Sequence, residues 1–181
     1  MSELAWETLD AEIAYSCPGF DVVHEDVRLP DGTETDYDYL EEPPAAVVLG
    51  FTPEENVVLI EEWRQPVGRV NRGLPAGSME GAEDPEQAAR REFEEETGYV
   101  ADSMEHLLVT EPANGVTDTV HHHFLARGCT PDGAQELDAD EQIDVETVPF
   151  EDLFAAVLAG DVRDGRTALT VLYHAATRNL G

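Results

Sequence analysis

Hydrophobic side chains in the first part of the chain fall in short runs that are typical of β-strands. Residues 20–29 and 33–40 alternate apolar and polar positions on either side of a Pro-Asp-Gly turn at 30–32, which predicts a β-hairpin. Residues 45–51 and 56–63 are apolar almost throughout, as strands buried on both faces are. The pattern therefore predicts a hairpin followed by two strands of a sheet core.

The spacing then becomes helical. Asp84 suits the N-cap of a helix, Pro85 its first position and Gly98 a left-handed C-cap. Between them, Ala89 and Phe93 lie four residues apart and form an apolar strip. We expect this helix to pack on the sheet.

The remainder of the chain mixes strand-like and helical runs. Strands with a few helices favour an α+β sandwich around a mixed sheet. One domain accounts for most of the length, with residues 1–42 as an N-terminal strand extension and 43–181 as the main domain. Strands are expected at 104–110, 119–126 and 142–148, loops at 111–118 and 130–141, and helices at 150–158 and 167–178.

The net charge of the chain makes some classes of binding partner unfavourable. The 181 residues carry a net charge of −30, and all ten basic residues are arginine. Such a surface repels nucleic acids and anionic membranes, so neither is expected as a partner. The acidic residues are spread along the chain, which is our basis for the hypothesis of a salt-rich cytoplasm, where screening removes self-repulsion. With no long apolar run and no leader, we expect a cytoplasmic protein.

Three glutamates on the predicted helix indicate metal chemistry. Glu92, Glu95 and Glu96 stand at i, i+3 and i+4 and so share one face. Their mutual repulsion would be relieved by a hard divalent cation, and magnesium prefers a few carboxylates together with phosphate oxygens. Arg91 lies four residues before Glu95 and can pair with it. A solvated acidic face is the alternative in so acidic a chain.

The segment resembles the signature of the Nudix family. That signature is Gly, five residues, Glu, seven residues, then Arg-Glu-hydrophobic-any-Glu-Glu-any-Gly-hydrophobic. Phe93 and Tyr99 depart mildly from it, because an aliphatic residue is usual there. It is filled by Gly77, Glu83, Arg91, Glu92, Phe93, Glu95, Glu96, Gly98 and Tyr99.

The resemblance implies a fold and a mechanism. The fold would be an α/β/α sandwich with the signature as loop-helix-loop, and the reaction would be hydrolysis of a nucleoside diphosphate linked to another moiety. Mg²⁺, or alternatively Mn²⁺, would be held by Glu92, Glu95, Glu96 and the backbone carbonyl of Ala76. Arg91 would orient the glutamates while water attacks one phosphorus in line.

Further segments resemble ADP-ribose pyrophosphatases. These are Tyr15 to Phe20, Val27 to Gly32, Glu62-Trp63-Arg64, Leu74-Pro75-Ala76-Gly77 and Ile143 to Phe150. In that subgroup the N-terminal strands help to form a homodimer, and ADP-ribose is split into AMP and ribose 5-phosphate. Gly73 and Ala113 depart from the usual Glu and Gly of that subgroup. Another NDP-sugar or dinucleotide, or a non-catalytic nucleotide-binding regulator, stays open as an alternative.

Substrate and base candidates lie outside the helix. The resemblance implies a late-loop carboxylate that acts as base or metal ligand. It is Asp140 or, the one we favour, Glu141, and either could instead be a solvated loop acid. Trp63 is a candidate for stacking on adenine or for the core, and Arg64 for a phosphate contact or a surface ion pair. Pro112 and Asp118 lie where that subgroup contacts its substrate.

Histidines and cysteines offer weaker candidates. His121, His122 and His123 cannot converge from one strand, because His122 would point away from the other two. Packed or surface histidines are therefore preferred to a transition-metal site. Cys17 and Cys129 lack metal spacing and are expected as free thiols, and Cys17 has no apparent base partner for nucleophilic catalysis.

Overall fold

A computed structural model describes residues 3–139 and 141–178 of the chain. They fall into two compact units. The N-terminal unit lies within residues 1–44 and 111–120, and the larger unit lies within residues 45–110 and 121–181.

The N-terminal unit is an antiparallel sheet of three strands, β1 (Glu7–Cys17), β2 (Phe20–Arg28) and β3 (Glu34–Glu41), in the order β1-β2-β3. Strands β2 and β3 confirm the expected hairpin. The sequence did not predict β1, whose alternation is broken by two register shifts along β2. Residues 111–120 join this unit through backbone hydrogen bonds to Leu40, from Leu40 N to Val116 O at 2.8 Å and from Asp118 N to Leu40 O at 3.1 Å.

The larger unit is built on a seven-stranded mixed sheet. Its main path runs β10-β5-β4-β9-β8, with β6 paired to β5 and β7 paired to β4. Only the β4–β9 pair is parallel among the described strand pairs of this sheet. The strands are β4 (Ala45–Phe51), β5 (Asn56–Arg64), β6 (Arg69–Gly73), β7 (Ala76–Ser78), β8 (Ser103–Thr110), β9 (His121–Arg127) and β10 (Ile143–Pro149).

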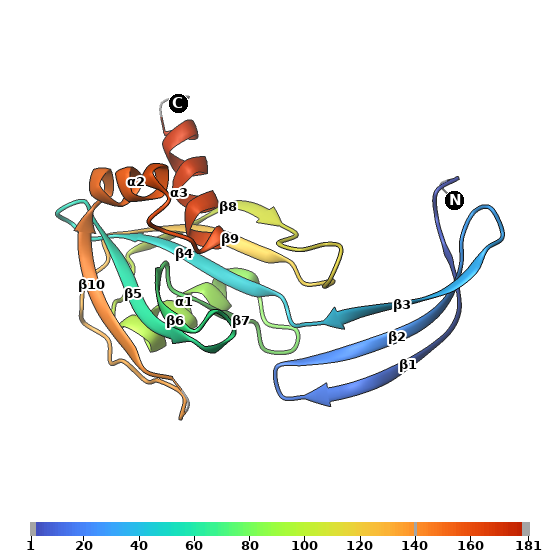
Figure 1. Cartoon of the computed structure of the whole chain (residues 1–181). Coiled ribbons are helices and arrows are strands. Elements are labelled where there is room, and N and C mark those ends of the chain that lie inside the picture. Colours follow the sequence, from blue (N-terminus) through green and yellow to red (C-terminus); the bar gives the residue numbers. More distant parts are fainter. Residues whose placement is uncertain (1–2, 140, 179–181) are drawn as a thin grey trace. The chain divides into compact units, whose positions relative to one another are not determined.

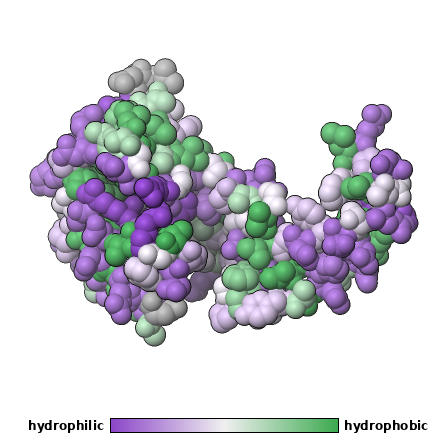
Figure 2. All heavy atoms as spheres, viewed as in Figure 1, coloured by the Kyte–Doolittle hydropathy of each residue, from purple (hydrophilic) through white to green (hydrophobic). Residues whose placement is uncertain are grey.

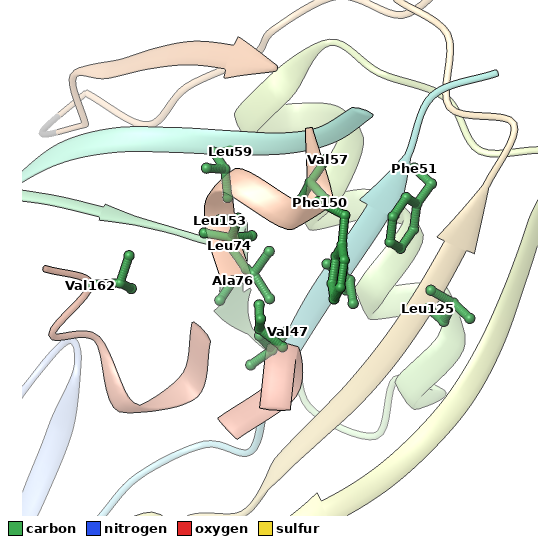
Figure 3. Close-up of a cluster of buried hydrophobic side chains, with 12 residues drawn as sticks. Val47, Phe51, Val57, Leu59, Leu74, Ala76, Leu125, Phe150, Leu153 and Val162 are labelled. Atoms are coloured by element: carbon green, nitrogen blue, oxygen red, sulfur yellow. The ribbon is translucent and has the colours of Figure 1, made fainter. Parts of the chain in front are cut away.

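Helices cover both faces of this sheet (Figure 1). Helix α1 (Pro85–Thr97) packs on one face, where Val48, Phe93 and Phe124 share a buried cluster. Helices α2 (Phe150–Ala159) and α3 (Gly165–Thr177) cover the other face. A second buried cluster lies on that face. It contains the alternate residues of β4, among them Val47 (Figure 3). The expected α/β/α sandwich is confirmed.

Local signals set the ends of α1 as the sequence indicated. The Asp84 side chain accepts hydrogen bonds from Glu86 N at 3.0 Å and Gln87 N at 3.4 Å. Gly98 has φ 70°, and its N–H donates to Glu94 O at 2.7 Å. The expected bounds of the other strands and helices agree to within a few residues. The short strands β6 and β7, and the 3-10 turn η1 (Gln65–Val67), were not predicted.

Hydrophilic side chains cover much of the visible surface of the larger unit, as the acidic composition requires (Figure 2). Apolar side chains concentrate in the two clusters that flank its sheet. None of the helices among the described residues has the length and apolar character to cross a bilayer.

Candidate functional site

The acidic face of α1 borders a cavity of the larger unit, which has a volume of about 470 Å³. Strand β7 and the turn after it form the facing wall, where Ala76 and Gly77 lie. Arg64 and Arg166 reach the cavity from β5 and α3. Its carboxylates are Glu80, Glu92, Glu95, Glu96, Glu136, Asp138 and Glu141. The predicted helix face is thus part of a concave, strongly anionic site.

Arg91 holds the glutamates of this face in place. Its Nη1 donates to Glu92 Oε1 at 2.8 Å and to Glu95 Oε2 at 3.0 Å. Its Nε and Nη2 form a two-point contact with Glu83 at 3.2 and 2.9 Å, and Nη2 also donates to Ser78 O at 3.1 Å. Hydrogen bonding to Glu83, then to Glu92 and Glu95, raises the pKa of Arg91. Arg91 therefore stays charged and ties α1 to the turn before it.

Glu96 lines the cavity with only 3% of its surface exposed. Its Oε2 accepts a hydrogen bond from Ala76 N at 2.8 Å, which links the helix to β7. Burial raises the pKa of Glu96 to about 8, although the bond from Ala76 opposes the shift. Burial also raises the pKa of Glu92 against the effect of Arg91. In both side chains burial therefore disfavours the charged carboxylate.

The lack of a side chain at Gly77 leaves room for the Glu92 carboxylate. A Cβ built on Gly77 would come within 2.0 Å of Glu92 Oε2 and 2.2 Å of its Cδ, so any larger residue would displace this side chain. Ala76 lies in β7 opposite Val47 of the neighbouring strand β4. The signature glycine is therefore explained by a close approach of backbone and carboxylate.

The acidic loop after β9 contributes carboxylates from far along the chain. Gln135 Nε2 donates to Glu96 O at 2.8 Å, and Glu136 N donates to Glu95 O at 2.9 Å, so the end of α1 anchors this loop. Glu141 lines the cavity, and its Oε2 accepts from Asp138 N at 3.0 Å. Asp140, the other candidate for the late carboxylate, lies outside the described residues.

Trp63 and Arg64 extend to opposite faces of β5. Arg64 lines the cavity and contacts Glu62 Oε2 through Nη2 at 2.8 Å. Trp63 is 53% exposed, and its Nε1 donates to Gln65 Oε1 at 2.8 Å. Arg64 is therefore placed beside the acidic cluster, whereas Trp63 is neither a core residue nor a lining residue of the cavity.

Two of the expected substrate residues belong to the N-terminal unit. Pro112 is exposed, and Asp118 Oδ1 accepts a hydrogen bond from Glu42 N at 3.0 Å. Asp118 also borders a small cavity together with Cys17 and Pro43. Their role in substrate binding stays a prediction.

The histidines of β9 do not form a shared site. His123 is fully buried, with Nε2 2.9 Å from Thr110 Oγ1 and Nδ1 2.7 Å from Thr170 Oγ1. Burial lowers its pKa to about 4. His122 lies on the other face, with its ring centroid 6.0 Å from that of His106. His123 is therefore a packed core residue, and Cys129 is a buried free thiol.

Several lining residues were not singled out in the sequence. Glu80, Glu136 and Asp138 come from loops, and an acidic loop in an acidic chain gives no signal that distinguishes them. Arg166 enters from the first turn of α3. The N-cap of that helix, Asp164, could have located the turn, because its side chain accepts from Thr167 N at 3.0 Å.

A second group of metal-ligand side chains lies in the N-terminal unit. His24, Asp36 and Asp38 place their ligand atoms within 4.8 Å of one another. His24 Nδ1 is 2.7 Å from Asp38 Oδ1, a contact that raises the pKa of His24. Because these side chains are largely exposed, an ion pair accounts for the arrangement.

Comparison with known proteins agrees with the geometry. Residues 41–169 match the family described as NUDIX domain. The chain is 34% identical over 174 residues to an ADP-ribose pyrophosphatase of Bacillus subtilis (strain 168), covering 96% of this chain and 94% of the relative. It is 32% identical over 141 residues to a GDP-mannose pyrophosphatase of Yersinia enterocolitica (serotype O:8 / biotype 1B), covering 71% of each.

Another relative carries a different description. A methanol dehydrogenase activator of Bacillus methanolicus is 32% identical over 150 residues, covering 82% of this chain and 81% of the relative. Among solved structures, one described as an ADP compounds hydrolase superposes with a TM-score of 0.85 at 18% identity, covering 100% of this chain and 98% of that one. At that identity the likeness supports the fold.

Proposed function

Because the chain belongs to the Nudix family of hydrolases, we propose that it cleaves ADP-ribose to AMP and ribose 5-phosphate with the help of Mg²⁺. The broader activity, hydrolysis of nucleoside diphosphate compounds, is supported by relatives described as pyrophosphatases of ADP-ribose and of GDP-mannose. The choice of ADP-ribose and of magnesium is our proposal.

One observation carries the proposal. Arg91 joins Glu83 to Glu92 and Glu95, which line the cavity, while Ala76 N on the facing wall donates to Glu96. A merely solvated acidic helix face would need neither the arginine contacts nor the burial of Glu96. The arrangement keeps several carboxylates close together at a site that is open to a small molecule.

The donor set fits a hard divalent cation. Glu92, Glu95 and Glu96, with the carbonyl of Ala76, offer oxygen ligands only, which suits Mg²⁺ or Mn²⁺. Burial, with a smaller effect of neighbouring carboxylates, raises the pKa of Glu92 and of Glu96, and a bound cation would favour their charged forms. When bound, the ion would offset the diphosphate charge and make a coordinated water more acidic.

The side chains of the protein would then orient the glutamates, accept a proton and contact the phosphates. Arg91 keeps Glu92 and Glu95 oriented, and Glu141 accepts the proton of the attacking water. The water oxygen forms a bond to one phosphorus, and the bridging P–O bond breaks, which leaves two phosphomonoesters. Arg64 and Arg166 lie where they can contact the phosphate groups.

A substrate panel tests the proposal. The purified protein is incubated in concentrated potassium chloride with ADP-ribose, ADP-glucose, GDP-mannose, NADH or a diadenosine polyphosphate, with Mg²⁺, with Mn²⁺ or with a chelator. We expect the highest kcat/KM for ADP-ribose with a divalent ion and no turnover with the chelator. Tight nucleotide binding without turnover of any compound would favour the regulator instead, and preference for GDP-mannose would replace the substrate.

We also propose a homodimer formed through the N-terminal unit. Trp6, Ile13 and Tyr15 of this unit each keep half or more of their surface exposed, which is costly in water unless a partner covers them. Light scattering at high salt should give twice the chain mass, and Ile13→Asp should give the monomer mass. A wild-type monomer would contradict the proposal. The cytoplasmic location and the salt adaptation stay predictions.

A further inference from the structure

A second cavity of about 280 Å³ lies next to the acidic one in the larger unit. It is bordered by the end of β5, by η1, by β6 and by the first turn of α3. Four of the ten basic residues of the chain line it, namely Arg64, Arg69, Arg163 and Arg166. In a protein of net charge −30, this concentration of positive charge is the opposite of what the composition favours.

Two of these arginines form no ion pair with the described residues. Arg64 contacts Glu62 and Arg166 contacts Asp164, but no salt bridge or side-chain hydrogen bond joins Arg69 or Arg163 to any part of the chain that the structure describes. The other eight arginines each pair with a carboxylate. With forty acidic residues available, two unpaired guanidinium groups beside one cavity are unexpected.

The strand register concentrates this charge further. Arg64 of β5 lies directly opposite Arg69 of β6, so the two side chains project from the same face. Like charges at directly opposed positions of an antiparallel pair are destabilising. An anion between the two side chains would turn this repulsion into two charge-assisted contacts.

The one carboxylate among the described lining residues of this cavity already has partners. Asp164 Oδ2 accepts from Thr167 N at 3.0 Å and from Thr167 Oγ1 at 2.6 Å, and its Oδ1 lies 3.4 Å from Arg166 Nε. Thr167 Oγ1 in turn accepts from Leu74 N at 2.8 Å. Asp164 therefore serves as the cap of α3 and does not neutralise Arg69 or Arg163.

We propose that this cavity is an anion subsite for a phosphate of the substrate beyond its diphosphate, a phosphomonoester on a ribose hydroxyl. Arg64 and Arg166 line both cavities, so a molecule whose diphosphate lies in the acidic cavity can extend a further phosphate toward Arg69 and Arg163. The preferred substrates are then nucleoside diphosphate compounds that carry this extra phosphate. The inference rests on the proposed function, because it takes the acidic cavity as the diphosphate site.

Calorimetry with two matched ligands tests the subsite without requiring turnover. The probes are AMP and adenosine 2′,5′-bisphosphate, which differ by one phosphate, each measured at the same potassium chloride concentration. We expect the bisphosphate to bind the wild-type protein about 10-fold more tightly than AMP. The variants Arg69→Gln and Arg163→Gln should each lose most of this preference while AMP affinity is unchanged. Neither arginine side chain has a partner within residues 3–139 and 141–178, so both variants should fold.

The control is Arg90→Gln, which changes an arginine of α1 that pairs with Glu86 away from the cavity and should keep the preference. Equal binding of both probes by the wild type, or an unaltered preference in Arg69→Gln, overturns the subsite. Displacement of the bisphosphate by inorganic phosphate at equal concentration would assign the cavity to free phosphate and overturn the substrate assignment. Preference for the bisphosphate without turnover on the substrate panel would support the subsite while refuting the proposed reaction.

Discussion

The carboxylate of Glu92 occupies the space that a side chain on Gly77 would need. A Cβ at Gly77 would lie 2.0 Å from Glu92 Oε2, and the atoms that must move are the flexible end of the glutamate. We therefore expect Gly77→Ala to fold with nearly wild-type stability while Glu92 is pushed from its place beside Arg91. A displacement of this size should lower kcat/KM about 100-fold, because misplacing a group by about 1 Å has that effect.

Gly81→Ala provides the control for this variant, since nothing lies within 4 Å of a Cβ at Gly81. Because Gly81 has a positive φ of 53°, an alanine there adds a small strain cost. The control should therefore lose a little stability and keep its activity. Thermal unfolding and hydrolysis assays on both variants give the comparison. A Gly77→Ala protein with full activity would show that Glu92 can move without consequence.

Arg91 should not be replaceable by lysine. Five contacts from three nitrogens fix Glu83, Glu92, Glu95 and the Ser78 carbonyl, and a single ammonium group cannot reproduce this fork. We expect Arg91→Lys to weaken divalent-ion binding, measured by calorimetry, by about 10- to 100-fold. The charge is kept, so the loss would come from geometry.

Arg90→Lys is the matched substitution on the neighbouring position. Arg90 forms an exposed pair with Glu86 at i, i+4, and such pairs contribute only a few tenths of a kcal/mol. Its ion affinity and stability should stay close to wild type. If both lysine variants bound the ion as wild type does, the proposed role of Arg91 in orienting the glutamates would be wrong.

Glu96 should make the metal-free protein less stable as the pH rises. Burial raises its pKa to about 8 from an ordinary value of 4.5. The folded protein therefore keeps a proton that the unfolded chain releases. This contribution to the free energy of unfolding is complete below about pH 4.5 and is lost as the pH rises through about 8. The Glu96→Gln variant has no titrating carboxyl at this position, so its free energy of unfolding should not fall for this reason.

Urea unfolding of both proteins with a chelator, from about pH 5 to about pH 8, measures the difference. The wild type should lose stability relative to Glu96→Gln by about 1 kcal/mol per pH unit within this window. Added Mg²⁺ should stabilise the wild type increasingly with pH, because protons compete with the ion for the carboxylate. Parallel pH profiles for the two proteins would exclude an unusually basic Glu96.

Local features were predictable from the sequence, and α1 is the best example. Asp84, Pro85 and Gly98 act within one turn of the helix, so their effect does not depend on the rest of the fold. The i, i+3, i+4 spacing likewise placed three glutamates on one face without knowledge of the sheet. These were the residues that indicated the chemistry.

Long-range features were not predictable in the same way. Glu136 and Asp138 reach the cavity because Gln135 ties their loop to the end of α1, a contact between residues about forty positions apart. The register that sets Arg64 opposite Arg69 depends on the unpredicted strand β6. Strand β1 was missed because register shifts interrupt its period of two. Each of these depends on pairing partners that single-chain patterns do not reveal.

Two glutamates of the same loop allow the proposed base to be separated from the general acidity of the cavity. Glu141 and Glu136 both line it, and Glu141 also accepts a hydrogen bond from Asp138 N, which glutamine can still accept. Glu141→Gln should therefore keep the loop in place, bind substrate with an unchanged KM, and lower kcat by about 10²- to 10⁴-fold, as loss of a general base does. Glu136→Gln removes the same charge from the same cavity and should stay within about 5-fold of wild type if no proton transfer depends on it. Steady-state kinetics of both variants, with kcat and KM determined separately, give the comparison. Equal losses in the two variants would show that the cavity needs negative charge from this loop and that Glu141 has no role of its own in proton transfer.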